Sequence, residues 1–255
     1  FWGQAWSGGV LENYGTIAGQ RFAGVRIFNS AADNRVFNDG TITGTRGIQI
    51  DGAAATVINT GGIITNSAAF AAFDGAAATA GLTLRNAGRI TAFDDAVLGS
   101  GFADRVVNTG VIDGDVLLGA GNDQYRGKHG TLLGELRGGD GNDTLIAGLG
   151  DDSVFGDKGV DRLDGGAGDD TLTGGNSNDI FVFTRAGGSD VVADFANDAD
   201  DLDLTAFRFT GFAAVSSRAT DVVGGLLIDL TGLGGGTAFL AGMTKALFDA
   251  GDVIL

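Results

Sequence analysis

The sequence predicts an all-β fold: a parallel β-solenoid (β-helix) that continues into a β-roll and ends in a β-rich C-terminal cap. Three observations predict it. An apolar-x-Asn-x-Gly-x-apolar pattern recurs in the first part of the chain, five unbroken nine-residue repeats run from Gly138 to Val182, and this period stops at Phe183. Repeats of this kind are the signature of stacked coils. We therefore divide the chain into residues 1–115, 116–182 and 183–255.

The first segment, residues 1–115, carries the asparagine pattern. Its copies fall at Leu11–Ile17, Val36–Ile42, Val57–Ile63, Leu84–Ile90 and Val106–Ile112, around Asn13, Asn38, Asn59, Asn86 and Asn108. Spacings of 21 to 27 residues fit one coil per copy, with loops of variable length. We expect the Asn and Gly residues to supply left-handed backbone at each corner. An ordinary β-sandwich with several Asn-x-Gly turns is the alternative.

The second segment, residues 116–182, holds the nine-residue repeats GGDGNDTLI, AGLGDDSVF, GDKGVDRLD, GGAGDDTLT and GGNSNDIFV. Position eight is always apolar, and position six is always aspartate: Asp143, Asp152, Asp161, Asp170 and Asp179. A further copy at Leu118–Arg126 places Asp123 in the same phase, and the coil after it carries a small insertion. Because two repeats make one turn, alternate aspartates are expected to stack on opposite sides of the roll.

The acidic residues gather in these repeats. Residues 113–203 hold 20 of the 32 acidic side chains but 6 of the 16 basic ones, in a chain of formal net charge −16. Such a field repels nucleic acid and attracts cations. Ca²⁺ takes six to eight oxygen ligands and tolerates irregular geometry. We expect roughly four to six Ca²⁺ ions, whose binding is coupled to folding of the roll.

Residues 118–182 resemble the RTX β-roll of secreted bacterial toxins, proteases and surface proteins. In that family each ion lies between stacked loops, bound by aspartate carboxylates and by backbone carbonyls at the glycine positions. The resemblance implies ligation by Asp123, Asp143, Asp152, Asp161, Asp170 and Asp179, by the backbone of Gly121, Gly139, Gly141, Gly148, Gly150, Gly166 and Gly168, and by the accessory oxygens of Asn142, Asp151, Asp169 and Asn178.

Some positions depart from the RTX pattern. Asp157 replaces the second residue of its repeat, Val160 the polar fifth and Ser177 the fourth glycine, which predicts weaker sites at those loops. Residues 127–137 lack the motif, so we expect no regular site there. Asp190 follows Asp170 by 20 residues and either completes the last site or is an ordinary turn aspartate.

The last segment, residues 183–255, is expected to cover the open end of the rod. Strands are predicted at Val191–Val192, Leu202–Leu204, Phe207–Phe209, Leu226–Leu230 and Phe239–Leu240, and a short helix at Met243–Ala250. The end, Phe248–Leu255, resembles the uncleaved C-terminal signal of type I secretion substrates. The resemblance implies export by that route to the cell surface or the medium, without an N-terminal signal.

We expect a protein that is not an enzyme. The chain has no cysteine, and its single histidine, His129, lacks the partners of a zinc site or a catalytic triad. No stretch predicts a transmembrane segment. The expected role is a secreted calcium-binding structural or adhesive protein, such as a surface-layer or extracellular filament subunit, that self-associates or binds bacterial surface polysaccharide.

Two alternative functions stay open. One is the C-terminal calcium and secretion module of a larger extracellular enzyme, such as a protease, a polysaccharide lyase or an epimerase. The other is a carbohydrate- or ice-binding solenoid, for which a regular array of threonines or aromatic residues on one face would be the mark.

Overall fold

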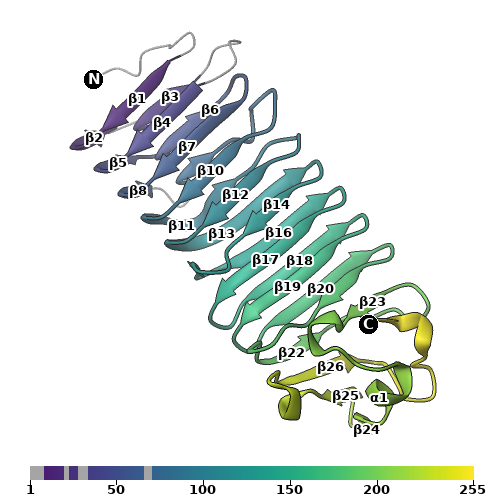
Figure 1. Cartoon of the computed structure of the whole chain (residues 1–255). Helices are drawn as coiled ribbons and strands as arrows, with labels where there is room; N and C mark the ends of the chain where they lie inside the picture. The colour runs from purple at the N-terminus through teal and green to yellow at the C-terminus, as the bar shows by residue number, and fades with distance from the viewer. Residues whose placement is uncertain (1–8, 20–22, 28–33, 66–70) are drawn as a thin grey trace.

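The computed structural model describes residues 9–19, 23–27, 34–65 and 71–255. The chain winds coil upon coil into a rod, with the strands as successive rungs from one end to the other (Figure 1). Nearly all its regular structure is β-strand, and the rungs of the two long sheets pair in parallel until the C-terminal hairpins. The predicted parallel β-solenoid that runs into a β-roll is thereby confirmed.

Sheet A forms one side of the rod. Its strands, in spatial order, are β1 (Val10–Asn13), β4 (Asn34–Asn38), β7 (Ala55–Asn59), β10 (Thr83–Asn86), β12 (Arg105–Asn108), β14 (Gln124–Arg126), β17 (Thr144–Leu149), β19 (Arg162–Ala167), β21 (Ile180–Val182), β23 (Asp201–Asp203) and β27 (Val253–Ile254). Equivalent positions of alternate repeats, one coil apart, lie side by side, as in the pairing of Leu145 with Leu163 and of Leu163 with Phe181. The register therefore follows the sequence period.

Sheet B forms the opposite side. It consists of β2 (Thr16–Ala18), β5 (Thr41–Gly44), β8 (Gly62–Thr65), β11 (Arg89–Leu98), β13 (Val111–Ala120), β16 (Glu135–Asp140), β18 (Ser153–Lys158), β20 (Thr171–Asn176), β22 (Ser189–Val192), β26 (Thr237–Ala241), β25 (Gly225–Asp229) and β24 (Ala219–Val222). Four short strands join its margin: β3 (Val25–Ile27), β6 (Ile48–Ile50), β9 (Phe73–Asp74) and β15 (Thr131–Leu132).

The core is a continuous apolar column between the two sheets. The eighth residue of every repeat is buried, from Leu145 to Phe181, and so are the corresponding residues of the asparagine coils, such as Ile63 and Ile112. Parallel strands with apolar side chains at equivalent positions pack the same way in every coil. No gap in strand pairing separates the asparagine coils from the aspartate coils, since β12 pairs with β14 and β14 with β17.

The asparagines form a buried side-chain ladder in place of the predicted left-handed corners. Neither these asparagines nor the glycines two positions after them have positive φ, so that expectation was wrong. Each amide nitrogen instead donates to the amide oxygen of the next coil, at 2.7 to 2.9 Å, along Asn13, Asn38, Asn59, Asn86 and Asn108. The last amide donates to the hydroxyl of buried Tyr125 at 3.4 Å. Asparagine therefore serves packing between coils at this position.

The C-terminal cap is β-rich, as predicted, but two of its elements differ from expectation. Phe207–Phe209 is no strand: Thr205–Phe207 forms the 3-10 helix η1, which Arg208 ends with φ of 53°. Met243–Ala250 contains turns, and Ala250–Asp252 forms the 3-10 helix η3. The described α-helix is α1 (Phe212–Ser216), and a further 3-10 helix is η2 (Thr231–Leu233). Phe212 and Phe248 pack together at 5.4 Å between ring centroids, which joins α1 to the turns of Met243–Ala250.

No helix within the described residues has the length and apolar character that crossing a membrane requires.

Candidate metal centre

The aspartates of position six lie in two rows along opposite edges of the rod. In the first row, each backbone N–H donates to the carboxylate of the next coil, at 2.6 to 2.9 Å, through Asp104, Asp123, Asp143, Asp161, Asp179 and Asp200. The second row joins Asp152, Asp170 and Asp190 in the same way. The alternation predicted from the period is therefore present, and Asp190 occupies a row position.

Each row aspartate of the repeats keeps one carboxylate oxygen buried and without a partner. In Asp123, Asp143, Asp161, Asp170 and Asp179 this oxygen is Oδ2, and in Asp152 it is Oδ1. The residues themselves are 1 to 3% exposed. A buried carboxylate oxygen without a hydrogen bond destabilises the folded state by roughly several kcal/mol unless a cation binds it. Hard carboxylate oxygens of this kind fit Ca²⁺.

Glycine at position one leaves space beside the same oxygens in four repeats, and Ala147 takes this position in the second repeat. A Cβ at Gly165 would lie 2.1 Å from Asp170 Oδ2, and one at Gly138 would lie 2.2 Å from Asp143 Oδ2. A side chain at this position would therefore occupy the space in front of the unpartnered oxygen. Sequence reasoning assigned roles to the second and fourth residues and missed the first, although its glycine recurs in four of the five repeats.

The predicted glycines lie in the turns between the sheets. Six of them have positive φ, namely Gly121, Gly139, Gly141, Gly150, Gly166 and Gly168, whereas Gly148 does not. The two departures Asp157 and Ser177 adopt the same left-handed backbone, with φ of 75° and 92°. Non-glycine residues are strained there, so these two loops are less well suited to the turn.

The fifth-position residues line the outer surface of the loops. Asn142 Oδ1 accepts the N–H of Val160, and Asp151 Oδ1 accepts the N–H of Asp169, both at 2.9 Å. Asp169 in turn accepts the N–H of Ser189 at 2.8 Å. Asn178 is exposed on its loop. These side chains thus connect neighbouring loops by hydrogen bonds. Their role as accessory calcium ligands stays a prediction.

Burial raises the pKa of the row carboxyls. It is the largest cause at each of them, opposed by the backbone hydrogen bonds and reinforced by neighbouring aspartates. The pKa rises to about 7 for Asp123, Asp152, Asp161 and Asp190, and to about 6 for Asp143 and Asp179. Without a cation, the rows therefore resist holding their charge at neutral pH.

The first row begins at a coil that needs no cation. Both oxygens of Asp104 are occupied, because Ser100 donates its N–H at 2.5 Å and its hydroxyl at 2.8 Å, and Leu82 donates its N–H at 2.6 Å. Sequence reasoning missed Asp104, although Gly99–Val107 carries aspartate at position six and an apolar residue at position eight. At the other end, Asp200 accepts the N–H of Asp179 and of Ala196, a position that the broken period beyond Phe183 concealed.

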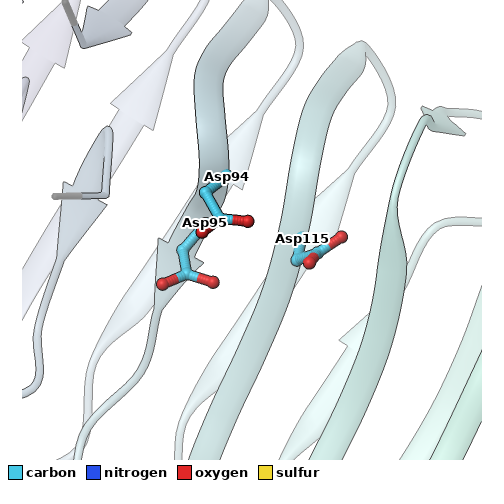
Figure 2. Close-up of side chains that lie close together, drawn as sticks. All are labelled: Asp94, Asp95 and Asp115. Carbon is cyan, nitrogen blue, oxygen red and sulfur yellow. The ribbon is translucent and has the colours of Figure 1, made fainter. Parts of the chain in front are cut away.

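A separate acidic group lies on the outside of sheet B. Figure 2 shows Asp94 and Asp95 on one strand with Asp115 on its neighbour, and their carboxylates lie within 4.8 Å of one another. Asp115 Oδ1 accepts the N–H of Glu135 at 2.8 Å. Asp94 is exposed and the other two are partly exposed. Because solvent reaches these groups, they lack the buried unpartnered oxygens that mark the two rows.

Comparison with known families agrees with this geometry. The model of the RTX calcium-binding nonapeptide repeat, which comprises four copies, matches residues 135–163 and 155–184. The matched residues contain the buried aspartates from Asp143 to Asp179. No curated protein matches the chain.

Proposed function

We propose that this chain, an RTX calcium-binding β-roll protein, is exported to the cell surface or the medium and serves there as a structural or adhesive rod whose roll folds when Ca²⁺ binds. The observation that carries the proposal is the pair of aspartate rows with buried, unpartnered oxygens. Asp123, Asp143, Asp152, Asp161, Asp170, Asp179 and Asp190 would hold the ions, together with backbone oxygens of the glycine turns. Bound Ca²⁺ supplies the positive charge that these carboxylates require.

Coupling between binding and folding follows from the charge. Residues 113–203 carry 20 acidic side chains, and the row carboxyls can be buried in charged form only beside a cation. Unfolded, the same aspartates are hydrated and far apart. The roll is therefore expected to be unfolded when free Ca²⁺ is low and folded at the millimolar levels outside cells.

Circular dichroism with and without EGTA tests this coupling. The β-signal of the roll should fall when EGTA removes Ca²⁺ and return when excess Ca²⁺ is added. Mg²⁺ at the same ionic strength is the control for screening, since Mg²⁺ demands a smaller, octahedral site. An unchanged spectrum in EGTA would contradict the proposal that calcium controls folding.

A structural role is supported by the form of the rod. Its core and both sheets run through the asparagine and aspartate coils without a break in pairing. A continuous stack of this kind transmits load along the rod and offers long faces to a binding partner. The strand edges at the ends of a solenoid favour stacking of further chains. We infer that the molecule works as a non-catalytic part of a surface layer or filament.

Calcium-dependent particle size tests the structural role. Light scattering and electron microscopy should show monomers in EGTA and ordered polymers or sheets in Ca²⁺. Monomers at every protein concentration in Ca²⁺ would favour the alternative of a calcium and secretion module of a larger extracellular enzyme. Ice binding is disfavoured, because the outward row of sheet B at Thr16, Thr41, Gly62 and Arg89 is not a regular threonine array.

A further inference from the structure

The outer face of sheet A carries an arginine stripe in the middle of an acidic molecule. The stripe comprises the outward residues of β7, β10, β12, β14 and β17: Thr56, Ile58, Thr83, Arg85, Arg105, Val107, Gln124, Arg126, Thr144 and Ile146. It holds three arginines and no acidic residue, in a chain with net charge −16. A local excess of one charge against the overall sign indicates a site with its own electrostatic purpose.

In the part of the chain that the structure describes, the arginines of the stripe have no acidic partners. Within the described residues, no ion pair involves Arg85, Arg105 or Arg126, whereas Arg89 and Arg137 on sheet B pair with Asp113 and with Glu135 and Asp157. Arg105 Nη1 donates to Gln124 Oε1 at 2.7 Å, which aligns that side chain along the sheet. The guanidinium groups of exposed Arg85 and Arg126 are available to an external anion.

The register spaces the charges regularly. Arg85 pairs with Val107, and Val107 pairs with Arg126, so the two arginines lie in one row, two strands apart. Strands lie about 4.8 Å apart, which separates their Cα atoms by roughly 10 Å. Arg105 occupies the neighbouring row between them, beside Thr83 and Gln124. The charges are therefore arranged along the rod axis on a flat, rigid sheet.

We propose that the arginine stripe binds an anionic polysaccharide lying along the rod. Its guanidinium groups would bind carboxylate or phosphate groups of the polymer, with bidentate geometry that favours arginine over lysine. Thr83, Gln124 and Thr144 offer hydrogen bonds for sugar hydroxyls, and half-buried Val107 and Ile146 offer apolar contact for ring C–H groups. The proposed polysaccharide site rests on the adhesive role proposed above and gives that role a ligand. Binding of the polysaccharide can nevertheless be measured independently of that role.

Charge complementarity favours this occupant over other anions. A protein that binds a membrane surface inserts protruding apolar side chains into it. The aliphatic residues of the stripe are instead half-buried within the sheet. Nucleic acid, a larger polyanion, would also approach the acidic residues of 113–203 that adjoin one end of the stripe. A single chain of sugars is narrow enough to lie along the stripe itself.

The test uses the full calcium-loaded chain and hyaluronate, an anionic polysaccharide, with dextran as the neutral probe. At low salt of about 50 mM, where screening is weak, hyaluronate should bind and dextran should not. The double variant R85Q/R126Q should weaken binding roughly tenfold or more, because two charge-assisted contacts are lost. The matched control R89Q/K158Q removes two positive charges from sheet B and should leave the affinity within about twofold.

Other outcomes would overturn the proposal. Absence of hyaluronate binding, or equal loss in both double variants, would show that the stripe is no site. Tighter binding of single-stranded DNA or of phosphatidylglycerol vesicles, lost in R85Q/R126Q, would assign the stripe to another partner. Calcium titration by circular dichroism establishes that each variant folds. Because folding and assembly are measured without polysaccharide, their failure is distinguishable from failure of the stripe.

Discussion

At the residue scale, one aspartate per repeat forms hydrogen bonds to the coils on both sides and keeps one carboxylate oxygen for a cation. Asp161 shows the arrangement: its N–H donates to Asp179, its Oδ1 accepts the N–H of Asp143, and its Oδ2 is buried without a partner. A single residue thereby links three coils in sequence, through its backbone N–H and its carboxylate, and leaves one oxygen for metal. Position six is aspartate in all five repeats, and its carboxylate supplies both the acceptor and the buried anionic oxygen.

Replacing Asp161 with asparagine separates these tasks. The amide oxygen of the new side chain would still accept the N–H of Asp143, but the buried anionic oxygen would be lost. We expect Asp161→Asn to remove at least one Ca²⁺ and to lower the affinity of adjacent sites, measured by isothermal titration calorimetry. Asp140→Asn makes the same charge change in an exposed ion pair with Lys158 and should bind Ca²⁺ normally. Equal effects of the two changes would contradict the assignment of the row.

Replacing Ser177 with glycine should stabilise the roll. Ser177 has φ of 92° at a turn position where the other repeats place glycine. A left-handed backbone costs non-glycine residues roughly 1–2 kcal/mol, so Ser177→Gly should raise the free energy of unfolding of the calcium form by about 1 kcal/mol. Chemical denaturation in excess Ca²⁺ measures the change. Ser153→Gly, within strand β18, is the control and should destabilise the roll.

Acid should stabilise the metal-free fold and weaken calcium binding. The folded pKa of Asp123, Asp152, Asp161 and Asp190 is raised to about 7, above the unfolded value near 4. Protonation of these carboxyls therefore stabilises the metal-free fold. The stabilisation is complete below about pH 4 and disappears as the pH rises through about 7. Because protons compete for the same oxygens, calcium affinity should rise between about pH 5.5 and 7.5. Calorimetry showing a flat affinity over that range would contradict the prediction.

At the element scale, two ladders hold the same kind of coil by different chemistry. The asparagine ladder joins β1, β4, β7, β10 and β12 through neutral amides, all buried. Each amide is both donor and acceptor, so the ladder is satisfied by protein atoms alone. The aspartate rows have acceptors only and require a cation. Tyr125 ends the asparagine ladder where the metal-dependent coils begin.

Removing one member of the asparagine ladder should destabilise the solenoid independently of Ca²⁺. Asn59→Ala deletes the bonds to Asn86 and from Asn38 and leaves buried amide groups unsatisfied. We expect a loss of about 3 kcal/mol, from these groups and the cavity together. Urea denaturation with and without EGTA should give the same loss, and Thr43→Ala, on the outer face of sheet B, is the control. A loss confined to the calcium form would contradict separate stabilisation of the two parts.

The sequence predicted the coils well because their period is a property of the residues themselves. Aspartate at position six and an apolar residue at position eight identify one side chain for the edge and one for the core. The role of Asn59 was misjudged, because its φ and its partner in the next coil depend on tertiary stacking. Asp104 was missed although Gly99–Val107 keeps the aspartate and the apolar residue of the repeat, and only the folded loop shows that Ser100 donates to its carboxylate. In the cap, Phe212 of α1 packs against Phe248 of a later turn, a contact that no local sequence pattern records.

At the scale of the whole molecule, the rod consists of a neutral part and a charged part in one continuous stack. Residues 1–112 hold 8 acidic and 7 basic side chains, whereas residues 113–203 hold 20 and 6. Strand pairing is unbroken between them. The two parts therefore share a core but differ in what stabilises them, and calcium acts on one of them directly.

Removal of calcium should unfold the charged part first. In EGTA, amide hydrogen exchange should become fast across residues 138–182 and stay slow in the asparagine strands β7, β10 and β12, because their ladder needs no cation. Mass spectrometry of peptic fragments resolves the two regions. Equal acceleration along the whole rod would show that the neutral part depends on the roll.

The parallel register also has a mechanical consequence. Strands run across the rod, so the hydrogen bonds between them point along its length. Tension applied at the two ends passes through every interface between neighbouring coils in series, and no interface shares the load of another. The tensile strength of the rod is then that of its weakest interface. The side-chain ladder has its longest bond, 3.4 Å between Asn108 and Tyr125, at the junction between the asparagine coils and the aspartate coils.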